Sequence, residues 1–123
     1  MTSVWPALRY DDARAALRFL VDGLGFTTHA VYDGADGDVA HAELLWPGGG
    51  GVMLGSGGEL AMARGGTTTY LVTEDVDAVV ERAVAHGGKL VQPVRDEDYG
   101  GRGGTVADAE GNLWSVGSYR PAV

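Results

Sequence analysis

The sequence predicts an α+β domain in which two tandem β-α-β-β-β modules form a curled mixed sheet around a cup, with the helices on its outer face. Two observations predict this fold class. The same order of strands and helix occurs twice along the chain, and equivalent positions lie 62 or 63 residues apart. The 21 glycines also gather between the predicted strands, which is typical of a sheet with many tight connections. We therefore expect a single domain over residues 1–123.

The first module is predicted over residues 4–56. Its helix should begin after Asp11 or Asp12, either of which can cap the N-terminus, because apolar residues then recur at helical spacing. The glycines that follow Val21 end this helix. The predicted strands of the module span residues 4–10, 26–32, 39–46 and 52–56.

The second module is predicted over residues 67–119, after a linker over residues 57–66 that has room for one helical turn in its ELAMAR segment. Its helix should begin after Asp75 or Asp77 and end at His86. The remaining elements are strands over residues 67–72 and 89–94 and a closing hairpin of residues 104–108 and 113–119. In the hairpin turn, Asp108 is predicted to be an Asx-type turn residue and Glu110 a solvated tip.

Three pairs of landmarks support an internal duplication. They are Gly25 and Gly88 after the helices, Asp12 and Asp75 before them, and Gly55 and Gly117 in the late strands. The first two pairs lie 63 residues apart and the third pair 62. Short loops alone can produce some self-similarity, but we interpret this agreement as a duplication.

Composition restricts the partners that the chain can have. The 17 acidic and 9 basic residues give a net charge of −8, which repels phosphate backbones, so we expect no nucleic-acid partner. The sequence has neither a signal-peptide pattern nor a run of about 18 apolar residues, so we expect no membrane partner and a cytoplasmic location. It contains no cysteine, which excludes disulfides, thiolate metal sites and a cysteine nucleophile.

Four segments, taken in their order and spacing, carry a family resemblance. They are ALRYDDARAALRFLVDGLGF, HAELLWPGGGGVMLGS, VTEDVDAVVERAVAHGG and YGGRGGTVADAEGNLWSVGSY. Over essentially its whole length the chain resembles the vicinal oxygen chelate superfamily of glyoxalase, bleomycin-resistance and extradiol dioxygenase proteins. The likeness is strongest to small bacterial glyoxalase-like proteins. The resemblance implies a homodimer, because two-module chains of this family commonly pair so that their sheets complete shared cups.

The resemblance also implies where a metal would be bound. Enzymes of this superfamily place His or Glu on the first strand of each module and Glu on the last, but the corresponding strands VWPALRY and TTTYLVT contain neither, and Ser115 stands where a Glu would be expected. We therefore predict no metal and no other cofactor. An unfamiliar site remains an alternative, because His41 and Glu43 share a strand face at i, i+2 and would supply two ligands or an acid–base pair.

With no metal, the predicted cup is lined by aromatic and polar side chains. The candidate ligand-binding residues are Trp46, Tyr99, Arg102, Trp114, His41, Glu43, Met53 and Tyr70. About half of the aromatic residues could instead pack under the helices, since strand alternation does not tell which face is which. Trp114 and Val116 share one face, and Ser115 lies on the other.

Arg102, with glycine on both sides, has two interpretations. As a functional residue it would orient a carboxylate, phosphate or carbonyl group of a ligand. As a structural residue it would pair with Glu43, Asp108 or Glu110.

The sequence therefore favours metal-independent binding of a small molecule, an apolar or aromatic metabolite or antibiotic, by a glyoxalase/bleomycin-resistance-like protein. The alternative is a metal-dependent lyase, isomerase or dioxygenase-like enzyme of the same superfamily that uses His41 and Glu43. A third possibility is a structural or regulatory domain with a filled cup that binds another protein. The sequence does not decide whether a reaction is catalysed.

Overall fold

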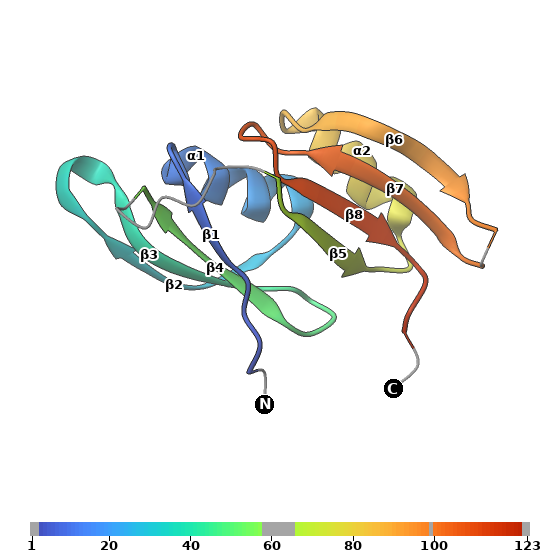
Figure 1. Ribbon diagram of the computed structural model, residues 1–123, viewed down its shortest axis with the longest axis horizontal. Helices are drawn as coiled ribbons and strands as arrows, with labels where there is room; N and C mark the ends of the chain where they lie inside the picture. Colours follow the sequence, from blue (N-terminus) through green and yellow to red (C-terminus); the bar gives the residue numbers. More distant parts are fainter. Residues whose placement is uncertain (1–2, 58–65, 99, 122–123) are drawn as a thin grey trace.

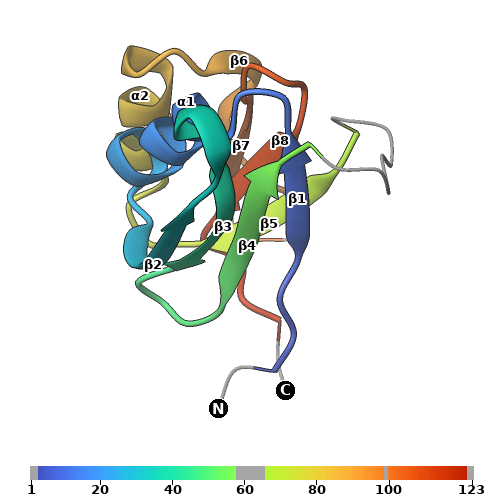
Figure 2. The same ribbon diagram turned by 90° about the vertical axis from the view of Figure 1, so that its left-hand side faces the viewer.

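The computed structural model describes residues 3–57, 66–98 and 100–121 and shows two four-stranded sheets with both helices on the same side (Figures 1 and 2). The N-terminal half contains β1 (Ala7–Tyr10), α1 (Ala13–Arg18), the π-helix η1 (Phe19–Leu24), β2 (Thr27–Asp33), the 3-10 helix η2 (Ala35–Gly37), β3 (Val39–Leu45) and β4 (Gly51–Ser56). The C-terminal half contains β5 (Thr68–Val72), α2 (Val76–Ala85), β6 (Lys89–Asp96), β7 (Arg102–Ala107) and β8 (Leu113–Gly117). The predicted α+β class with a curled mixed sheet is confirmed.

The two sheets have the same topology. The strand order is β1-β4-β3-β2 in the first sheet and β5-β8-β7-β6 in the second. In each sheet the first strand of the half pairs in parallel with the last, and the other pairs are antiparallel. Parallel partners need a long connection, and in each half this connection contains one α-helix followed by two strands of the same sheet.

The first helix begins as predicted and ends differently. The Oδ1 atom of Asp12 accepts a hydrogen bond from the N–H of Ala15 at 3.0 Å, a standard N-terminal cap. After Arg18 the helix continues as η1 with π-type hydrogen bonding, which the sequence did not predict, and it stops at Gly25 with φ of 100°. Gly23 allows the end of α2 to approach closely, because a Cβ atom there would lie 3.2 Å from the Cβ atom of His86.

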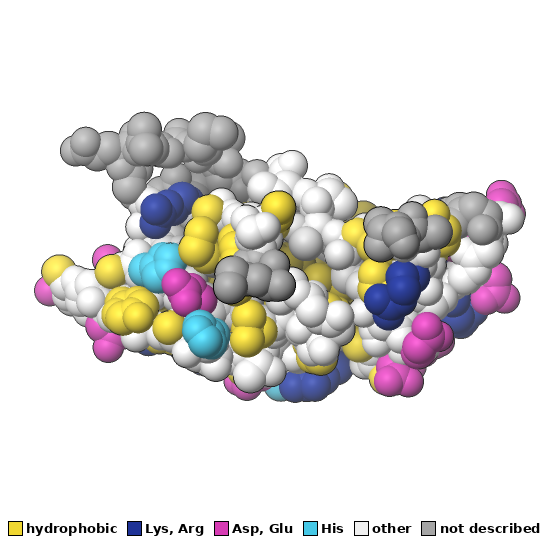
Figure 3. All heavy atoms as spheres, turned by 90° about the horizontal axis from the view of Figure 1, so that it is seen from below, with side chains coloured by type: hydrophobic (Ala, Val, Ile, Leu, Met, Phe, Trp, Pro, Cys, Tyr) yellow, Lys and Arg dark blue, Asp and Glu magenta, His cyan; other side chains and the backbone are white. Residues whose placement is uncertain are grey.

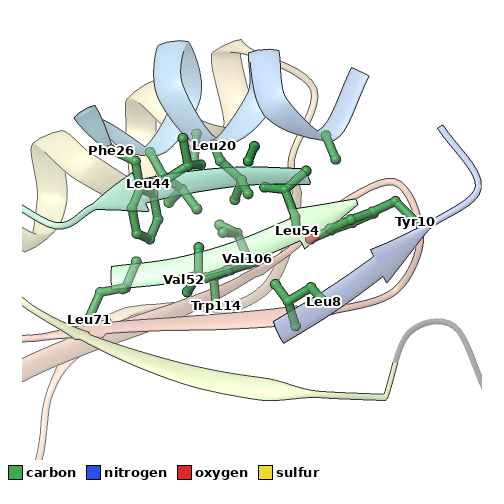
Figure 4. Packing of buried hydrophobic residues seen from close by; sticks show 14 of the residues in the cluster. Leu8, Tyr10, Leu20, Phe26, Leu44, Val52, Leu54, Leu71, Val106 and Trp114 are labelled. Atoms are coloured by element: carbon green, nitrogen blue, oxygen red, sulfur yellow. The ribbon is translucent and has the colours of Figure 1, made fainter. Parts of the chain in front are cut away.

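One apolar core lies between the sheets and the helices (Figure 4). Trp114 of β8 is fully buried, and the ring of Phe26 makes edge-to-face contacts with Trp114 and with Trp46, at centroid distances of 5.8 and 5.0 Å. The indole Nε1–H of Trp46 donates to the carbonyl oxygen of Val72 at 3.0 Å. These three aromatic rings therefore connect the two halves of the chain.

Element boundaries differ from the predictions at several ends. Strand β1 begins at Ala7 rather than residue 4, and β6 runs on to Asp96, into a segment that was predicted to be a loop. The predicted helical turn in ELAMAR lies outside the described residues. Among the described helices, none has the length and apolar character needed to cross a membrane.

Candidate functional site

Strand alternation sorts the side chains of the first sheet between two faces. Ala42 and Leu44 of β3 and Leu54 of β4 are buried beneath the helices, whereas His41, Glu43 and Met53 alternate with them and are half-buried. These last three therefore lie on the face directed away from α1 and α2. We call this surface the open face; it comprises Arg9, His29, Tyr32, His41, Glu43 and Met53. Figure 3 views the molecule from this side. It shows His, acidic and basic side chains gathered with apolar ones over the first sheet.

A hydrogen-bonded pair lies at the centre of the open face. The Nε2 atom of His41 is 2.9 Å from Oε2 of Glu43, and the Nε2 atom of His29 is 4.0 Å from the other carboxylate oxygen, Oε1. The ring of Tyr32, opposite His41 in the β2–β3 ladder, is stacked on the imidazole at a centroid distance of 6.0 Å and an interplanar angle of 28°. The cluster thus combines an oriented imidazole–carboxylate pair with a flat aromatic surface.

Arg9 belongs to the same face and was missed by the sequence reasoning. In β1 its neighbours Leu8 and Tyr10 are buried, so Arg9 projects to the opposite side. Arg9 is paired with Gly55 of β4, and a Cβ atom on Gly55 would lie 2.6 Å from the Nη1 atom of Arg9. The alternation of side chains along β1 could have predicted this position, because assigning Leu8 and Tyr10 to the core places Arg9 on the other face.

Among the residues that the structure describes, the other predicted ligand-binding residues do not join this cluster. Trp114 is in the core, and Tyr99 lies outside the described residues. Trp46 and Tyr70 line a small hollow of about 220 Å³ between the two halves, next to the glycines that connect β3 and β4. The phenol of Tyr70 donates a hydrogen bond to the carbonyl oxygen of Tyr119 at 2.7 Å. The structure therefore brings together His41, Glu43 and Met53, and separately Trp46 and Tyr70.

Arg102 lies on the helix side of the second sheet. Its Nε and Nη2 atoms donate to the two carboxylate oxygens of Asp77 on α2, at 2.8 and 3.0 Å, and Nη1 donates to Asp96 at 3.1 Å. The hydrogen bond from Arg102 holds the pKa of Asp77 below its usual value. The hydrogen bonds to Asp77 and, second, to Asp96 raise the pKa of Arg102. The three partners predicted for a structural Arg102 were wrong, because its real partners are brought near by the packing of α2 on the sheet.

The closing hairpin is fastened to the first half of the chain through buried polar contacts. The carboxylate of Asp108 accepts hydrogen bonds from the Tyr10 hydroxyl at 2.7 Å and from the Trp114 Nε1–H at 3.1 Å, and also from the backbone N–H groups of Glu110 and Asn112. The Asx-type turn at Asp108 is confirmed. Burial, followed by the hydrogen bond to Asp108, raises the pKa of Tyr10.

Glu110 was predicted to be a solvated tip, and this was wrong. Its two carboxylate oxygens accept hydrogen bonds from the backbone N–H groups of Asp11 and Asp12, at 2.6 and 2.8 Å. They therefore satisfy two donors that precede α1.

A larger hollow of about 570 Å³ lies on the helix side, between α1, the end of α2 and the closing hairpin. Asp108, Glu110 and Asp12 all line it, and each of their carboxylates already accepts backbone hydrogen bonds. These three carboxylates thus serve the fold, and Arg18, Asp22 and His86 also line the hollow. We place the candidate site on the open face, where polar side chains pair with one another beside a stacked aromatic ring.

The residues at the expected metal positions do not fit a metal ion. Ser115 is hydrogen-bonded to Thr105 at 3.1 Å, and the open side of β1 presents the Arg9 guanidinium, which repels a cation. Across residues 3–57, 66–98 and 100–121, no three His, Asp or Glu side chains are arranged to hold a metal. The described residues at these positions therefore do not form a metal-binding site.

Comparisons with known proteins agree with this architecture. The family model described as the Glyoxalase/Bleomycin resistance protein/Dioxygenase superfamily matches residues 2–116. An uncharacterized protein of Mycobacterium bovis is 36% identical over 122 residues, which cover 91% of this chain and 80% of the relative.

Two solved structures illustrate the likeness of fold. TioX from Micromonospora sp. ML1 has a TM-score of 0.76 and 30% identity, covering 96% of this chain and all of that one. A mutant of the fosfomycin resistance protein FosX from Listeria monocytogenes, in complex with Mn(II) and a dihydroxypropylphosphonic acid, has a TM-score of 0.69 at 17% identity, covering 98% and 94%; it supports the fold alone. The family match and the identity with the mycobacterial relative show that the chain belongs to the glyoxalase/bleomycin resistance protein/dioxygenase superfamily.

Proposed function

We propose that this protein binds a small apolar or aromatic molecule, a metabolite or antibiotic, on the open face without a metal ion. One observation carries the proposal. The His41–Glu43 pair, hydrogen-bonded at 2.9 Å, lies half-buried beside the stacked Tyr32 ring and faces away from the core. Oriented polar groups beside aromatic and thioether surface are typical of small-molecule sites, because the apolar area supplies affinity and the polar pair selects the ligand.

We also propose that the protein acts in the cytoplasm as a homodimer whose second copy completes the cup. The open face of one sheet is a wall rather than an enclosed pocket, and a ligand bound to it alone would keep one side in water. A partner sheet would cover that side and add buried apolar area.

The metal-dependent alternative would need a third ligand beside His41 and Glu43. Among the described residues, His29 is a candidate, with its Nε2 atom 4.0 Å from Oε1 of Glu43. Arg9 on the same face opposes a divalent cation, so we do not adopt this alternative.

A thermal-shift screen of aromatic metabolites and antibiotics tests the proposal, performed once with a chelator and once with Zn²⁺, Mn²⁺ or Ni²⁺. A ligand present at about 100 times its Kd should stabilise the fold by about 2.7 kcal/mol. That corresponds to a rise in Tm of roughly 10 °C for a domain of this size, and we expect the same rise with the chelator as with the metals.

Two histidine variants locate the site. His41→Ala should weaken binding by about ten-fold, whereas His86→Ala, at the end of α2 beside the helix-side hollow, should leave it unchanged. Stabilisation that appears only with metal, or that is lost in His86→Ala and kept in His41→Ala, would contradict the proposal.

A further inference from the structure

Arg9 is placed to bind an acidic group on the open face. In the part of the chain that the structure describes, its guanidinium makes no hydrogen bond or ion pair, whereas Arg14, Arg82, Arg95 and Arg102 all do. A guanidinium offers five N–H donors in a fixed planar arrangement that suits both oxygens of a carboxylate. An exposed arginine without a protein partner therefore keeps this capacity for a ligand.

Gly55 sets the position of this guanidinium. A Cβ atom at residue 55 would lie 2.6 Å from the Nη1 atom of Arg9 and 2.7 Å from the carbonyl oxygen of Ala40. Because residue 55 has no side chain, the guanidinium can lie against β4 instead of extending into water. From β1 it thus reaches across β4, in the direction of β3 and the His41–Glu43 pair.

The surface next to the guanidinium suits an aromatic ring. Met53 lies on β4 opposite Glu43 of β3, and the stacked rings of His41 and Tyr32 lie on β3 and β2. Adjacent strands are about 4.8 Å apart, so the distance from a guanidinium over β4 to a ring over β2 is roughly 10 Å. A two-ring aromatic acid spans this distance, with its carboxylate at Arg9 and its rings over His41 and Tyr32.

We infer that the open face binds planar aromatic acids and that Arg9 recognises their carboxylate. This inference rests on the proposed function, since it names the ligand class of the same site. The Glu43 carboxylate on the same face is hydrogen-bonded to His41 and lies 4.0 Å from His29.

Calorimetric titration of two probes of nearly the same shape tests the inference, with a chelator present. These are 2-naphthoate, which carries the carboxylate, and 2-naphthamide, which does not. The wild-type protein should bind the acid at least about ten-fold more tightly than the amide. Arg9→Gln should remove this difference by weakening only the acid, and Arg9→Lys should restore part of it, since an ammonium group cannot bind both oxygens in the same fixed geometry.

Arg18→Gln is the matched control, because it removes one positive charge on α1, on the opposite side of the sheet. It should keep the ten-fold preference for the acid. Equal binding of acid and amide by the wild-type protein, or equal losses in Arg9→Gln and Arg18→Gln, would overturn the role of Arg9 while leaving ligand binding on the open face intact. If neither probe bound at concentrations up to millimolar, the inference would also be overturned. The thermal-shift screen of metabolites and antibiotics would then test the proposed function separately.

Discussion

At the scale of single residues, Asp108 joins the closing hairpin to the start of the chain. It is 7% exposed and accepts four hydrogen bonds, two of them from the side chains of Tyr10 and Trp114. A buried carboxylate is costly unless its oxygens are satisfied, and here all of these donors are held by the fold. The contact between Tyr10 and Asp108 therefore couples residues that are 98 positions apart in the sequence.

Removing the hydroxyl of Tyr10 should weaken the fold and change its response to alkaline pH. Tyr10→Phe should lower the free energy of unfolding at pH 7 by about 1–3 kcal/mol, the cost of losing a buried hydrogen bond to a charged acceptor. In the wild-type protein the pKa of Tyr10 is raised, so above about pH 10 the unfolded chain releases this proton while the folded chain keeps it, and stability falls as the pH rises.

Urea unfolding at pH 7, 10 and 11 measures both effects. The variant should lose less stability than the wild-type protein between pH 10 and 11, because it has no phenol at this position. Parallel losses in the two proteins would contradict the role given to Tyr10. Tyr32→Phe, a change on an exposed ring, should alter stability at pH 7 by no more than about 0.5 kcal/mol.

At the scale of elements, an ion-paired arginine holds α2 against β7. Arg102 hydrogen-bonds both oxygens of Asp77 in the first turn of the helix and one oxygen of Asp96 at the end of β6. The glycines around Arg102 suggested a ligand contact, but strand alternation places its side chain on the helix side. Its role in the described structure is to join three elements.

Asp77→Asn should therefore lower the Tm at neutral pH, and Arg102→Gln should do the same. The pKa of Asp77 is lowered in the fold, so its contribution to stability is present above the ordinary aspartate pKa and is lost as the pH falls through the lower, folded value. The difference in Tm between the wild-type protein and Asp77→Asn should accordingly shrink between pH 5 and pH 2. A difference that stays constant over this range would show that the carboxylate charge does not matter.

Arg102→Gln should also leave binding of 2-naphthoate unchanged, since Arg102 lies on the helix side of the second sheet and the open face belongs to the first sheet. Titration of this variant beside Arg9→Gln separates the two arginines. If Arg102→Gln lost as much affinity as Arg9→Gln, the result would contradict binding on the open face and would indicate that the ligand also contacts the second sheet.

Local sequence patterns predicted the elements well and the faces of the strands only in part. The order of elements, the Asp12 cap and the turn at Asp108 follow from short-range signals, and all three are present in the structure. Alternation grouped Trp114 with Val116, but whether that pair lies in the core or in the cup depends on where the helices pack. The partners of Arg102 and Glu110 could not be predicted for the same reason, since they come from elements distant in the sequence.

At the scale of the whole molecule, two similar halves share a core, and the described helices cover only the side opposite the open face (Figures 2 and 3). In the first sheet this face has charged, aromatic and thioether side chains beside one another. We expect a second copy of the chain to cover this face. Of the residues predicted for the site, His41, Glu43 and Met53 lie together on this face. Arg9, which was not among those predicted, lies on the same face because its neighbours Leu8 and Tyr10 in β1 are buried.

Sedimentation equilibrium tests the expected dimer. The protein at about 10 μM should have twice the mass of the 12.8 kDa chain, because an interface that completes a cup should bury more than about 1,000 Å². A mass of one chain at this concentration, with or without bound 2-naphthoate, would contradict the proposed assembly.

The most direct test of metal-free binding on the open face is an NMR titration of the ¹⁵N-labelled protein with 2-naphthoate in the presence of a chelator. The amide signals of His41, Glu43 and Met53 should shift progressively to saturation. Those of Ala15, Ala16 and Ala109, which line the helix-side hollow, should stay in place. Shifts confined to the helix-side hollow, or shifts on the open face only after a divalent metal is added, would contradict the account.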